Sequence, residues 1–235
     1  MRVYGSQLKA CAMNELFNPL LLTFKLAFCT AAALLCIGTP AAYAIAFRRG
    51  FFKTILCSIV SMPLVLPPTV VGFYLLLLLG PTTPTGRFLI DTLHVKLLFT
   101  FWGLVAGSVL CSFPFMVNPL ISGFESVPRS LIEAAATLGK TRWQTLVHVL
   151  LPNMKGALIT GVILSFSHAI GEFGVVLMIG GKISAVTRVA SIAVYDEVES
   201  FNYPTAHFYA AVLFVVSFIV LVTVYAVNRR FVRPL

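Results

Sequence analysis

Charged residues are scarce in this chain of 235 residues. Asp, Glu, Lys and Arg together make up 11% of it, whereas hydrophobic residues make up 59%. A soluble globular domain is about one-quarter charged, so the composition excludes that class and predicts an integral membrane protein. A net charge of +9 would suggest nucleic-acid binding in a soluble protein. Here we expect no nucleic-acid partner, because basic residues beside apolar runs mark the cytoplasmic side of membrane proteins.

Cysteine and histidine form no pattern typical of a reactive or metal-binding site. The five cysteines include no C-x-x-C pair, and most of them fall inside apolar runs, so neither a zinc site nor a disulfide framework is indicated. The four histidines share no metal-ligand spacing, and no Ser/His/Asp or Cys/His set can be assembled on one side of a membrane. We therefore expect no metal, no cofactor, no catalytic residue and no enzymatic activity. No cleavable signal peptide is visible before residue 19.

Five apolar runs are long enough to cross a bilayer, which takes about 20 residues of helix. They lie at roughly residues 19–47, 54–80, 97–121, 154–180 and 206–228. The sequence therefore predicts an all-α, polytopic membrane protein with about five transmembrane helices in one domain, residues 19–228. A short extracytoplasmic segment, residues 1–18, and a short cytoplasmic tail, residues 229–235, would flank this domain.

Basic residues mark one end of the predicted spans. They occur in three segments, at residues 48–53, 129–155 and 229–233. With five spans, all three segments fall on the same side, and positively charged loops lie in the cytoplasm. We therefore predict that the N-terminus lies outside the cell and the C-terminus in the cytoplasm.

Prolines interrupt the predicted spans. The second run contains Pro63 and then Pro67-Pro68-Thr69, and proline breaks a helix and frees backbone carbonyls. Such backbone is tolerated in a membrane only where it is buried in protein or lines a water-filled cavity. We interpret this break as a discontinuous helix beside a transport pathway. The alternative is a kink that only aids packing.

Glu172 is a carboxylate deep in the fourth apolar run, between Gly171 and Gly174. Carboxylates within a membrane are usually functional, so Glu172 could bind a cation or hold a gate through an ion pair. The alternative is that the span ends near Ile170 and leaves Glu172 at the outer interface. Lys25, near the outer end of the first run, is expected to extend toward the lipid headgroups. The alternative is that it attracts an anion toward the outer mouth of a pathway.

The segment at residues 125–152 is amphipathic and lies between the third and fourth runs, so something other than lipid must cover one of its faces. Ser126 would cap a first short helix, and Gly139 would end it in the left-handed conformation. Thr141 and Gln144 would form a capping box for a second helix, which Pro152 would close. The apolar positions of the first helix recur at helical spacing: Leu131, Ala134, Ala135 and Leu138.

The same segment contains Gly139-Lys140-Thr141, which matches only the end of a phosphate-binding loop. The full pattern requires a glycine where Ala134 stands, so we do not expect this chain to bind ATP. Glu133 is either a solvated charge or a carboxylate that fixes the register of a docked partner, by pairing with a base of that partner or with Arg129.

Glu133-Ala134-Ala135, then Gly139, then Leu151-Pro152 resemble the EAA loop of ATP-binding-cassette importer permeases. Residues 63–72 and 171–174, with the order of the spans, resemble molybdate permeases, of which sulfate and tungstate permeases are close relatives. The resemblance covers about residues 19–228. Some members carry an extra first span, which we do not expect here because residues 1–18 are too short and polar to form it.

The resemblance implies a type I importer in which two copies of this chain form a pathway on their two-fold axis. Two cytoplasmic ATP-binding subunits would carry ATP and Mg²⁺, and an oxyanion-binding protein would dock outside. Coupling to the ATPase would depend on six residues: Glu133, Ala134, Ala135, Leu138, Gly139 and Pro152. The pathway or its gate would involve six others: Pro67, Pro68, Thr69, Gly171, Glu172 and Gly174.

A bare carboxylate would repel a dianion, so we expect Glu172 to pair with a cation, Arg188 or Lys182, rather than to bind the substrate. The leading hypothesis is thus the permease subunit of an ATP-driven importer of molybdate or tungstate in the inner membrane. The alternatives are a permease for sulfate or another small anion and, more remotely, a stand-alone channel or a membrane-embedded enzyme. The amphipathic helix pair, which has no site of its own, argues against the last two.

Overall fold

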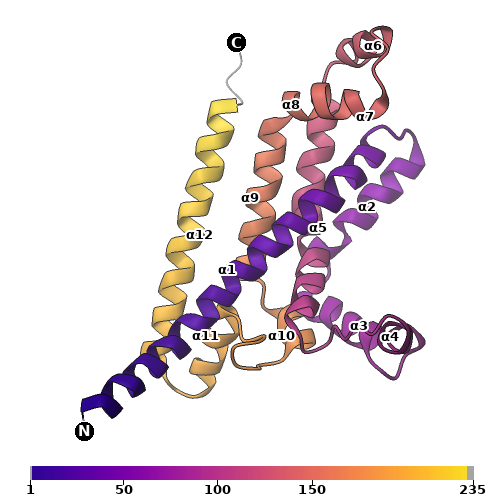
Figure 1. Cartoon of the computed structure of the whole chain (residues 1–235). Coiled ribbons are helices and arrows are strands. Elements are labelled where there is room, and N and C mark those ends of the chain that lie inside the picture. The colour runs from indigo at the N-terminus through magenta and orange to yellow at the C-terminus, as the bar shows by residue number, and fades with distance from the viewer. Residues whose placement is uncertain (1, 232–235) are drawn as a thin grey trace.

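The computed structural model describes the backbone of residues 2–231 and the side chains of residues 16–226. Every regular element in this part of the chain is a helix, which confirms the predicted all-α class. Figure 1 shows long helices running side by side between two ends that carry shorter helices.

Three unbroken helices in the described part are long and apolar enough to cross a membrane. They are α1 (Arg2–Ala46), α5 (Phe101–Ser126) and α12 (Tyr203–Phe231). Two further spans are present if each bent helix pair is counted as one. In the first pair, α2 (Phe51–Val65) meets α3 (Pro68–Leu79) at an angle of 105°. The proline-rich stretch at residues 63–69 therefore breaks the second predicted span.

The second bent pair joins the amphipathic segment to the fourth predicted span. Residues 142–153 meet α9 (Lys155–Gly171) at 79°. The helix then stops at Gly171 and resumes as α10 (Gly174–Gly180), so the predicted run at residues 154–180 is not one continuous helix. The first predicted span also differs at its boundary, because α1 begins at Arg2 and continues through the expected N-terminal segment.

The remaining helices are short and lie at the two ends of the molecule (Figure 1). One end carries α6 (Arg129–Thr137), α7 (Arg142–Thr145), the π-helical turn η2 (Leu146–Leu150) and α8 (Leu151–Asn153). The other end carries α4 (Pro84–Arg87), the π-helical turn η1 (Phe88–Thr92) and α11 (Ala190–Glu199), beside α3 and α10.

Helix α1 crosses α5 and α9 (Figure 1), and close packing holds the three together. Met116 of α5 is fully buried and fills the space left by Gly38 of α1 and Gly161 of α9. Lipid tails are as apolar as leucine, so helix association in a membrane depends on such close packing rather than on exclusion of water. Helix α12 packs more loosely, and only 11% of its most apolar stretch is buried. Its exposed face carries apolar side chains suited to lipid: Phe214, Val215, Phe218, Ile219 and Tyr225.

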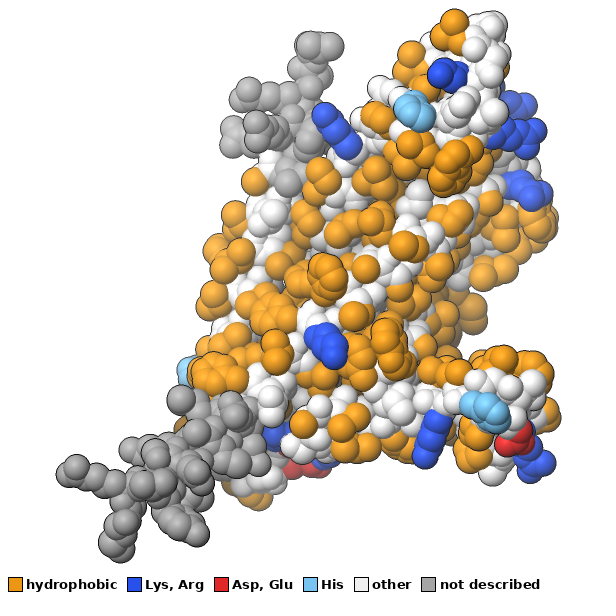
Figure 2. Space-filling model, viewed as in Figure 1, with side chains coloured by type: hydrophobic (Ala, Val, Ile, Leu, Met, Phe, Trp, Pro, Cys, Tyr) orange, Lys and Arg blue, Asp and Glu red, His pale blue; other side chains and the backbone are white. Residues whose placement is uncertain are grey.

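The end that carries α6–α8 also holds the turn between α1 and α2 and the C-terminal end of α12 (Figure 1). Figure 2 shows apolar side chains over the middle of the molecule, with most of the Lys and Arg side chains near its ends and one of them within the apolar middle. The basic segments at residues 48–53 and 129–155 thus share one end, as the sequence predicted. The side chains of the third segment, residues 229–233, lie outside the described residues. Which end faces the cytoplasm stays a prediction.

Candidate functional site

The amphipathic segment has two apolar faces rather than one. On its inner face, Ala135 is 4% exposed, and Leu146 and Leu150 are buried in a cluster with Phe124 of α5. The transmembrane body therefore covers this face, which anchors α6 and η2 at the end of the bundle. The sequence predicted that something other than lipid covers one face of this segment. For the inner face, this cover is the transmembrane part of the same chain.

The second face points away from the body and is not covered by any described residue. Leu138 is 77% exposed and Trp143 is 71% exposed, and Leu131 and Ala134 are also exposed. We call these four residues the outer face of α6 and α7. Leucine and tryptophan side chains gathered on a surface outside the apolar middle of the molecule are typical of a protein docking site.

The turn between α6 and α7 fixes the shape of the outer face. Gly139 has φ of +70°, the left-handed conformation in which glycine pays no side-chain penalty. The N–H of Lys140 donates to the carbonyl of Ala135, and the N–H of Gly139 donates to the carbonyl of Ala136. This pair of bonds is the Schellman motif, and it satisfies helix-end carbonyls that would otherwise lack partners. The predicted role of Gly139 in ending the helix is confirmed.

The predicted capping box is also present. The N–H of Gln144 donates to Thr141 Oγ1 at 3.2 Å, and the N–H of Thr141 donates to Gln144 Oε1 at 3.0 Å. Two backbone donors at the start of α7 are thereby satisfied. This fixes the start of the helix that carries Trp143.

Replacing Thr141 with alanine is expected to destabilise α7 by about 1 kcal/mol, because the N–H of Gln144 loses its acceptor. Hydrogen exchange at residues 142–145 should become faster, while exchange in α5 stays unchanged. Thr141→Ser keeps the hydroxyl and serves as the matched control. Equal exchange in all three proteins would show that the capping box does not order α7.

Two boundaries of the amphipathic segment differ from the prediction. Helix α5 continues through Ser126, whose hydroxyl donates to the carbonyl of Gly123, so Ser126 does not cap α6. Pro128 occupies the cap position instead and contributes no side-chain bond. Pro152 lies in the first turn of α8, where the missing N–H costs nothing, and the unit ends at the bend beside Met154.

Glu133 lines an open groove of about 510 Å³ between α6 and the turn after α1. Arg129 lines the same groove, but no ion pair joins it to Glu133, so the predicted i−4 pairing is wrong. The groove's acid–base pair is instead Lys53 with Glu125, which ties α2 to the end of α5. Glu133 is exposed and keeps its carboxylate available for a partner.

The two interrupted helices meet near the other end of the bundle. A Cβ placed on Gly174 would lie 2.9 Å from Pro68 Cβ and 3.1 Å from the backbone nitrogen of Thr69. The start of α10 therefore packs directly against the start of α3. Beside this contact is an open hollow of about 440 Å³. Its walls come from α3, α9 and the α9–α10 break: Pro68, Thr69, Ser167, His168, Gly171, Glu172, Phe173 and Gly174.

Five of the six residues predicted to form a pathway or gate line this hollow, although they come from distant parts of the sequence. Pro67 is the exception and occupies the cap of α3. Their role in transport stays a prediction. A pathway beside discontinuous helices requires irregular backbone next to an open space. The structure has this arrangement, because the breaks of two helices border the hollow.

Glu172 is buried and does not pair with Arg188 or Lys182. The residue is 5% exposed, and its Oε2 atom lies 3.5 Å from Nδ1 of His168. The backbone N–H groups of Val175 and Phe173 face the same carboxylate. The proposed ion pair is therefore wrong, because both candidate cations are paired elsewhere. The alternative was correct that the helix ends near Ile170, but Glu172 is not exposed at an interface.

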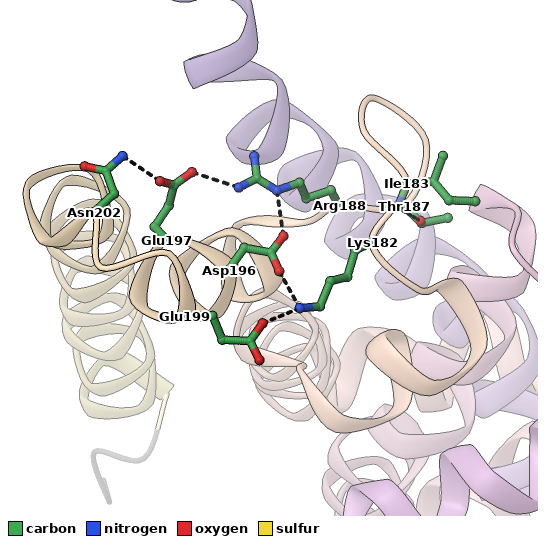
Figure 3. A network of polar contacts seen from close by, with 8 residues as sticks. All are labelled: Lys182, Ile183, Thr187, Arg188, Asp196, Glu197, Glu199 and Asn202. Atoms are coloured by element: carbon green, nitrogen blue, oxygen red, sulfur yellow. Dashed lines mark hydrogen bonds and ion pairs between the residues drawn. The ribbon is translucent and has the colours of Figure 1, made fainter.

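Arg188 and Lys182 belong to a network of ion pairs at the α11 end of the molecule (Figure 3). Arg188 Nε lies 2.9 Å from Asp196 Oδ2, and its Nη2 lies 2.9 Å from Glu197 Oε1. Lys182 Nζ lies 2.7 Å from Asp196 Oδ1 and 2.6 Å from Glu199 Oε2. These ion pairs tie the loop after α10 to α11. They therefore hold in place the part of the chain that follows α10.

Acidification is expected to loosen this network. The hydrogen bond from Lys182, and then one from Tyr195, holds the pKa of Glu199 below its ordinary value. A carboxyl whose pKa is lowered by folding stabilises the protein fully above its unfolded pKa of about 4, and this stabilisation is lost as the pH falls through the folded value. We expect hydrogen exchange in α11 to be constant from about pH 7 to 5 and to be less protected, after correction for intrinsic rates, below about pH 4. Glu199→Gln should show a weaker acid response, and an identical response would contradict this assignment.

Two residues of these sites did not emerge from the sequence. Trp143 could have been recognised as a large aromatic residue placed directly after a helix cap in an amphipathic segment. His168 lies one turn before Glu172 and lines the same hollow. Its i, i+4 spacing from an intramembrane carboxylate was the available signal. Lys25, expected near the headgroups, is exposed with its Nζ 4.8 Å from the centre of the Phe101 ring.

Comparison with known proteins shows the family of this chain. A family model described as "binding-protein-dependent transport system inner membrane component" matches residues 35–233. The molybdenum transport system permease protein ModB of Azotobacter vinelandii is 44% identical over 89% of this chain and 92% of that protein. The sulfate transport system permease protein CysT of Escherichia coli (strain K12) is 34% identical over 77% of this chain and 65% of that protein.

Solved structures share the fold. The MetNI methionine ABC transporter superposes with a TM-score of 0.71 at 16% identity, over 94% of this chain and 98% of that chain. A bacterial alginate ABC transporter in complex with a periplasmic protein has a TM-score of 0.66 at 18% identity, over 92% and 80% of the two chains. The family match covers most of this chain, and the similar folds agree with it. The chain therefore belongs to the family of inner membrane components of binding-protein-dependent transport systems.

Proposed function

We propose that this chain is the permease subunit of an ATP-driven importer that moves molybdate or tungstate across the inner membrane. The identity to a molybdenum permease protein is 44% over nearly all of both chains, whereas the sulfate permease protein matches at 34% over a smaller share of its length. These values favour molybdate or tungstate over sulfate.

The observation that carries the proposal is the outer face of α6 and α7. Its leucine and tryptophan side chains are exposed at an end of the molecule where basic side chains also gather. A separate ATP-binding subunit would cover this face and carry ATP and Mg²⁺. Glu133, Ala134 and Leu138 would contact that subunit, Ala135 would anchor α6 to the body, and Gly139 would set the angle of the turn. Pro152 would help to hold α8 in place, where the amphipathic segment meets α9.

In this proposal the end with α6–α8 faces the cytoplasm, which places the C-terminus inside the cell and the N-terminus outside. The oxyanion-binding protein would dock at the opposite end, near α4, α10 and α11. Two copies of the chain would enclose the pathway. The hollow beside Pro68 and Gly174 would face that pathway, so the break between α2 and α3 would let helix ends and polar groups reach the substrate.

Uptake of labelled molybdate by cells with and without this chain tests the proposal. We expect uptake to be lost when the chain is absent and restored when it is returned. Excess unlabelled tungstate should suppress uptake, whereas excess sulfate should not. Equal suppression by sulfate would assign the chain to a sulfate importer, and uptake that does not depend on the chain would reject the proposal.

A further inference from the structure

His168 is held in place at the wall of the hollow by two residues of α5. Its ring stacks on Phe115, with centroids 4.3 Å apart and 27° between the ring planes. Its Nδ1 atom lies 3.0 Å from Ser112 Oγ. Since Ser112 and Phe115 are three residues apart on one helix, they face the same side. The ring therefore has a fixed plane and a fixed inner edge, while 29% of the side chain stays exposed.

Glu172 adds a charge to the same inner edge. Its side chain is 2% exposed, and its Oε2 atom, 3.5 Å from His168 Nδ1, has no hydrogen-bond partner among the described residues. No Lys or Arg forms an ion pair with it in the described structure. A buried carboxylate is costly unless it is paired or protonated. Besides the backbone N–H groups of Val175 and Phe173, His168 is the ionisable group that faces this carboxylate, at ion-pair distance when the ring is protonated.

The other ring nitrogen, Nε2, forms no hydrogen bond or ion pair with the described residues, and the His168 side chain lines the hollow. If the Ser112 hydroxyl donates to Nδ1, the neutral ring must carry its hydrogen on Nε2. If the ring is an imidazolium paired with ionised Glu172, Nε2 again carries hydrogen. A third arrangement, with hydrogen on Nδ1 alone, would present a lone pair to the hollow, and an anion in the hollow would disfavour it. An oxyanion therefore selects the states in which His168 offers an N–H donor.

We propose that His168 contacts the transported oxyanion through Nε2–H, and that Ser112 and Glu172 are positioning residues that hold its ring and balance its charge. The proposal rests on the proposed function and assigns the substrate contact within it. A tetrahedral oxyanion accepts hydrogen bonds and donates none when fully ionised, so the donor on His168 suits it. Glu172 also lines the hollow, but its side chain is only 2% exposed, and a proton on its carboxyl group or on His168 offsets its repulsion of an anion.

The part of the hollow contributed by α3 is compatible with an anion. Thr69 is exposed there and lies in the first turn of α3. At the start of α3, Pro68 has no N–H, and the N–H groups of Val70 and Val71 donate to the carbonyl of Pro67, so only the N–H of Thr69 can add positive potential there. No exposed carboxylate lines the hollow.

Replacing His168 with phenylalanine tests the contact, because the ring shape is kept and the N–H is lost. Losing a hydrogen bond to a charged ligand is expected to lower molybdate uptake roughly tenfold to a hundredfold. His168→Gln should retain most uptake because its amide can donate near the position of Nε2. His207→Phe is the matched control, since His207 is an exposed histidine on α12 outside the hollow. The expected loss is confined to the His168→Phe protein.

A binding measurement on the wild-type protein gives a second readout that does not depend on any variant folding. The dimer in lipid nanodiscs, with ¹⁵N-labelled histidine, is titrated with tungstate in the absence of ATP. We expect the Nε2 signal of His168 to shift in a saturable way, and the signals of His94, His148 and His207 to stay unchanged. Glu172→Gln should weaken the shift, which a purely structural role would not require.

The two measurements separate the possible failures. If wild-type protein takes up molybdate but His168→Phe transports equally well and the His168 signal does not shift, the inference about His168 is wrong and the proposed function stands. If wild-type protein takes up no oxyanion under conditions that support ATP hydrolysis, the proposed function is wrong. A shift of all four histidines to the same extent would show non-specific anion binding and would also overturn the inference.

Discussion

Replacing Ala134 with arginine is expected to lower ATP-driven uptake by roughly a hundredfold or more, the effect typical of disrupting the centre of a docking interface. Ala134 is exposed on the outer face of α6, so arginine fits the isolated chain without strain. The long charged side chain would prevent close approach of another protein surface to Leu131 and Leu138. The measurement is uptake of labelled molybdate, together with copurification of the ATP-binding subunit.

Ala136→Arg is the matched control for this variant. Ala136 is also exposed on α6, but it lies two residues further on, about 200° around the helix from Ala134. We expect it to change uptake much less. Equal uptake by wild type and the Ala134→Arg protein, at equal membrane levels, would contradict the assignment of the outer face as the coupling surface.

Replacing Gly174 with alanine is expected to destabilise the contact between α10 and α3 and to impair transport. The new Cβ would meet Pro68 Cβ at 2.9 Å and the backbone nitrogen of Thr69 at 3.1 Å. Backbone and a proline ring cannot move aside easily, so we expect a loss of about 1–3 kcal/mol in stability, as in overpacked cores. Compared with wild type, the Gly174→Ala protein should have a lower melting temperature in detergent and should also show slower uptake.

Gly171→Ala provides the control for the Gly174 variant, because it makes the same substitution three residues earlier. An added Cβ on Gly171 has no atom within 4 Å, and Gly171 is exposed. This variant should keep the wild-type melting temperature. Equal melting temperatures for the Gly174→Ala and Gly171→Ala proteins would show that the close approach of α10 to α3 does not contribute to stability.

The features that the sequence predicted well are those with a local physical cause. Pro67 and Pro68 cannot continue a helix, so the break between α2 and α3 is visible in the sequence. Gly139 has no Cβ, so it adopts the left-handed turn without steric cost, and the side chains of Thr141 and Gln144 satisfy nearby backbone N–H groups. The membrane class follows from the scarcity of charge alone. Each of these predictions depends on neighbouring residues in the chain.

The predictions that failed depend on which of several possible partners a side chain meets in the folded chain. Arg188 and Lys182 are close enough to Glu172 in sequence to suggest a pair, but α11 supplies three carboxylates that bind them instead. Ser126 is a good helix cap by residue type, yet it is the last residue of α5, and its hydroxyl donates to the carbonyl of Gly123 instead of capping α6. His168 acquires its importance only when α5 brings Ser112 and Phe115 against it.

The most direct test of this account is molybdate uptake by proteoliposomes that contain this chain and its ATP-binding subunit, with the oxyanion-binding protein outside. We expect uptake to require ATP on the side of the membrane that bears α6 and α7, and to stop when Ala134 is replaced with arginine. Uptake without ATP, or uptake driven equally well by ATP on the opposite side alone, would contradict the account.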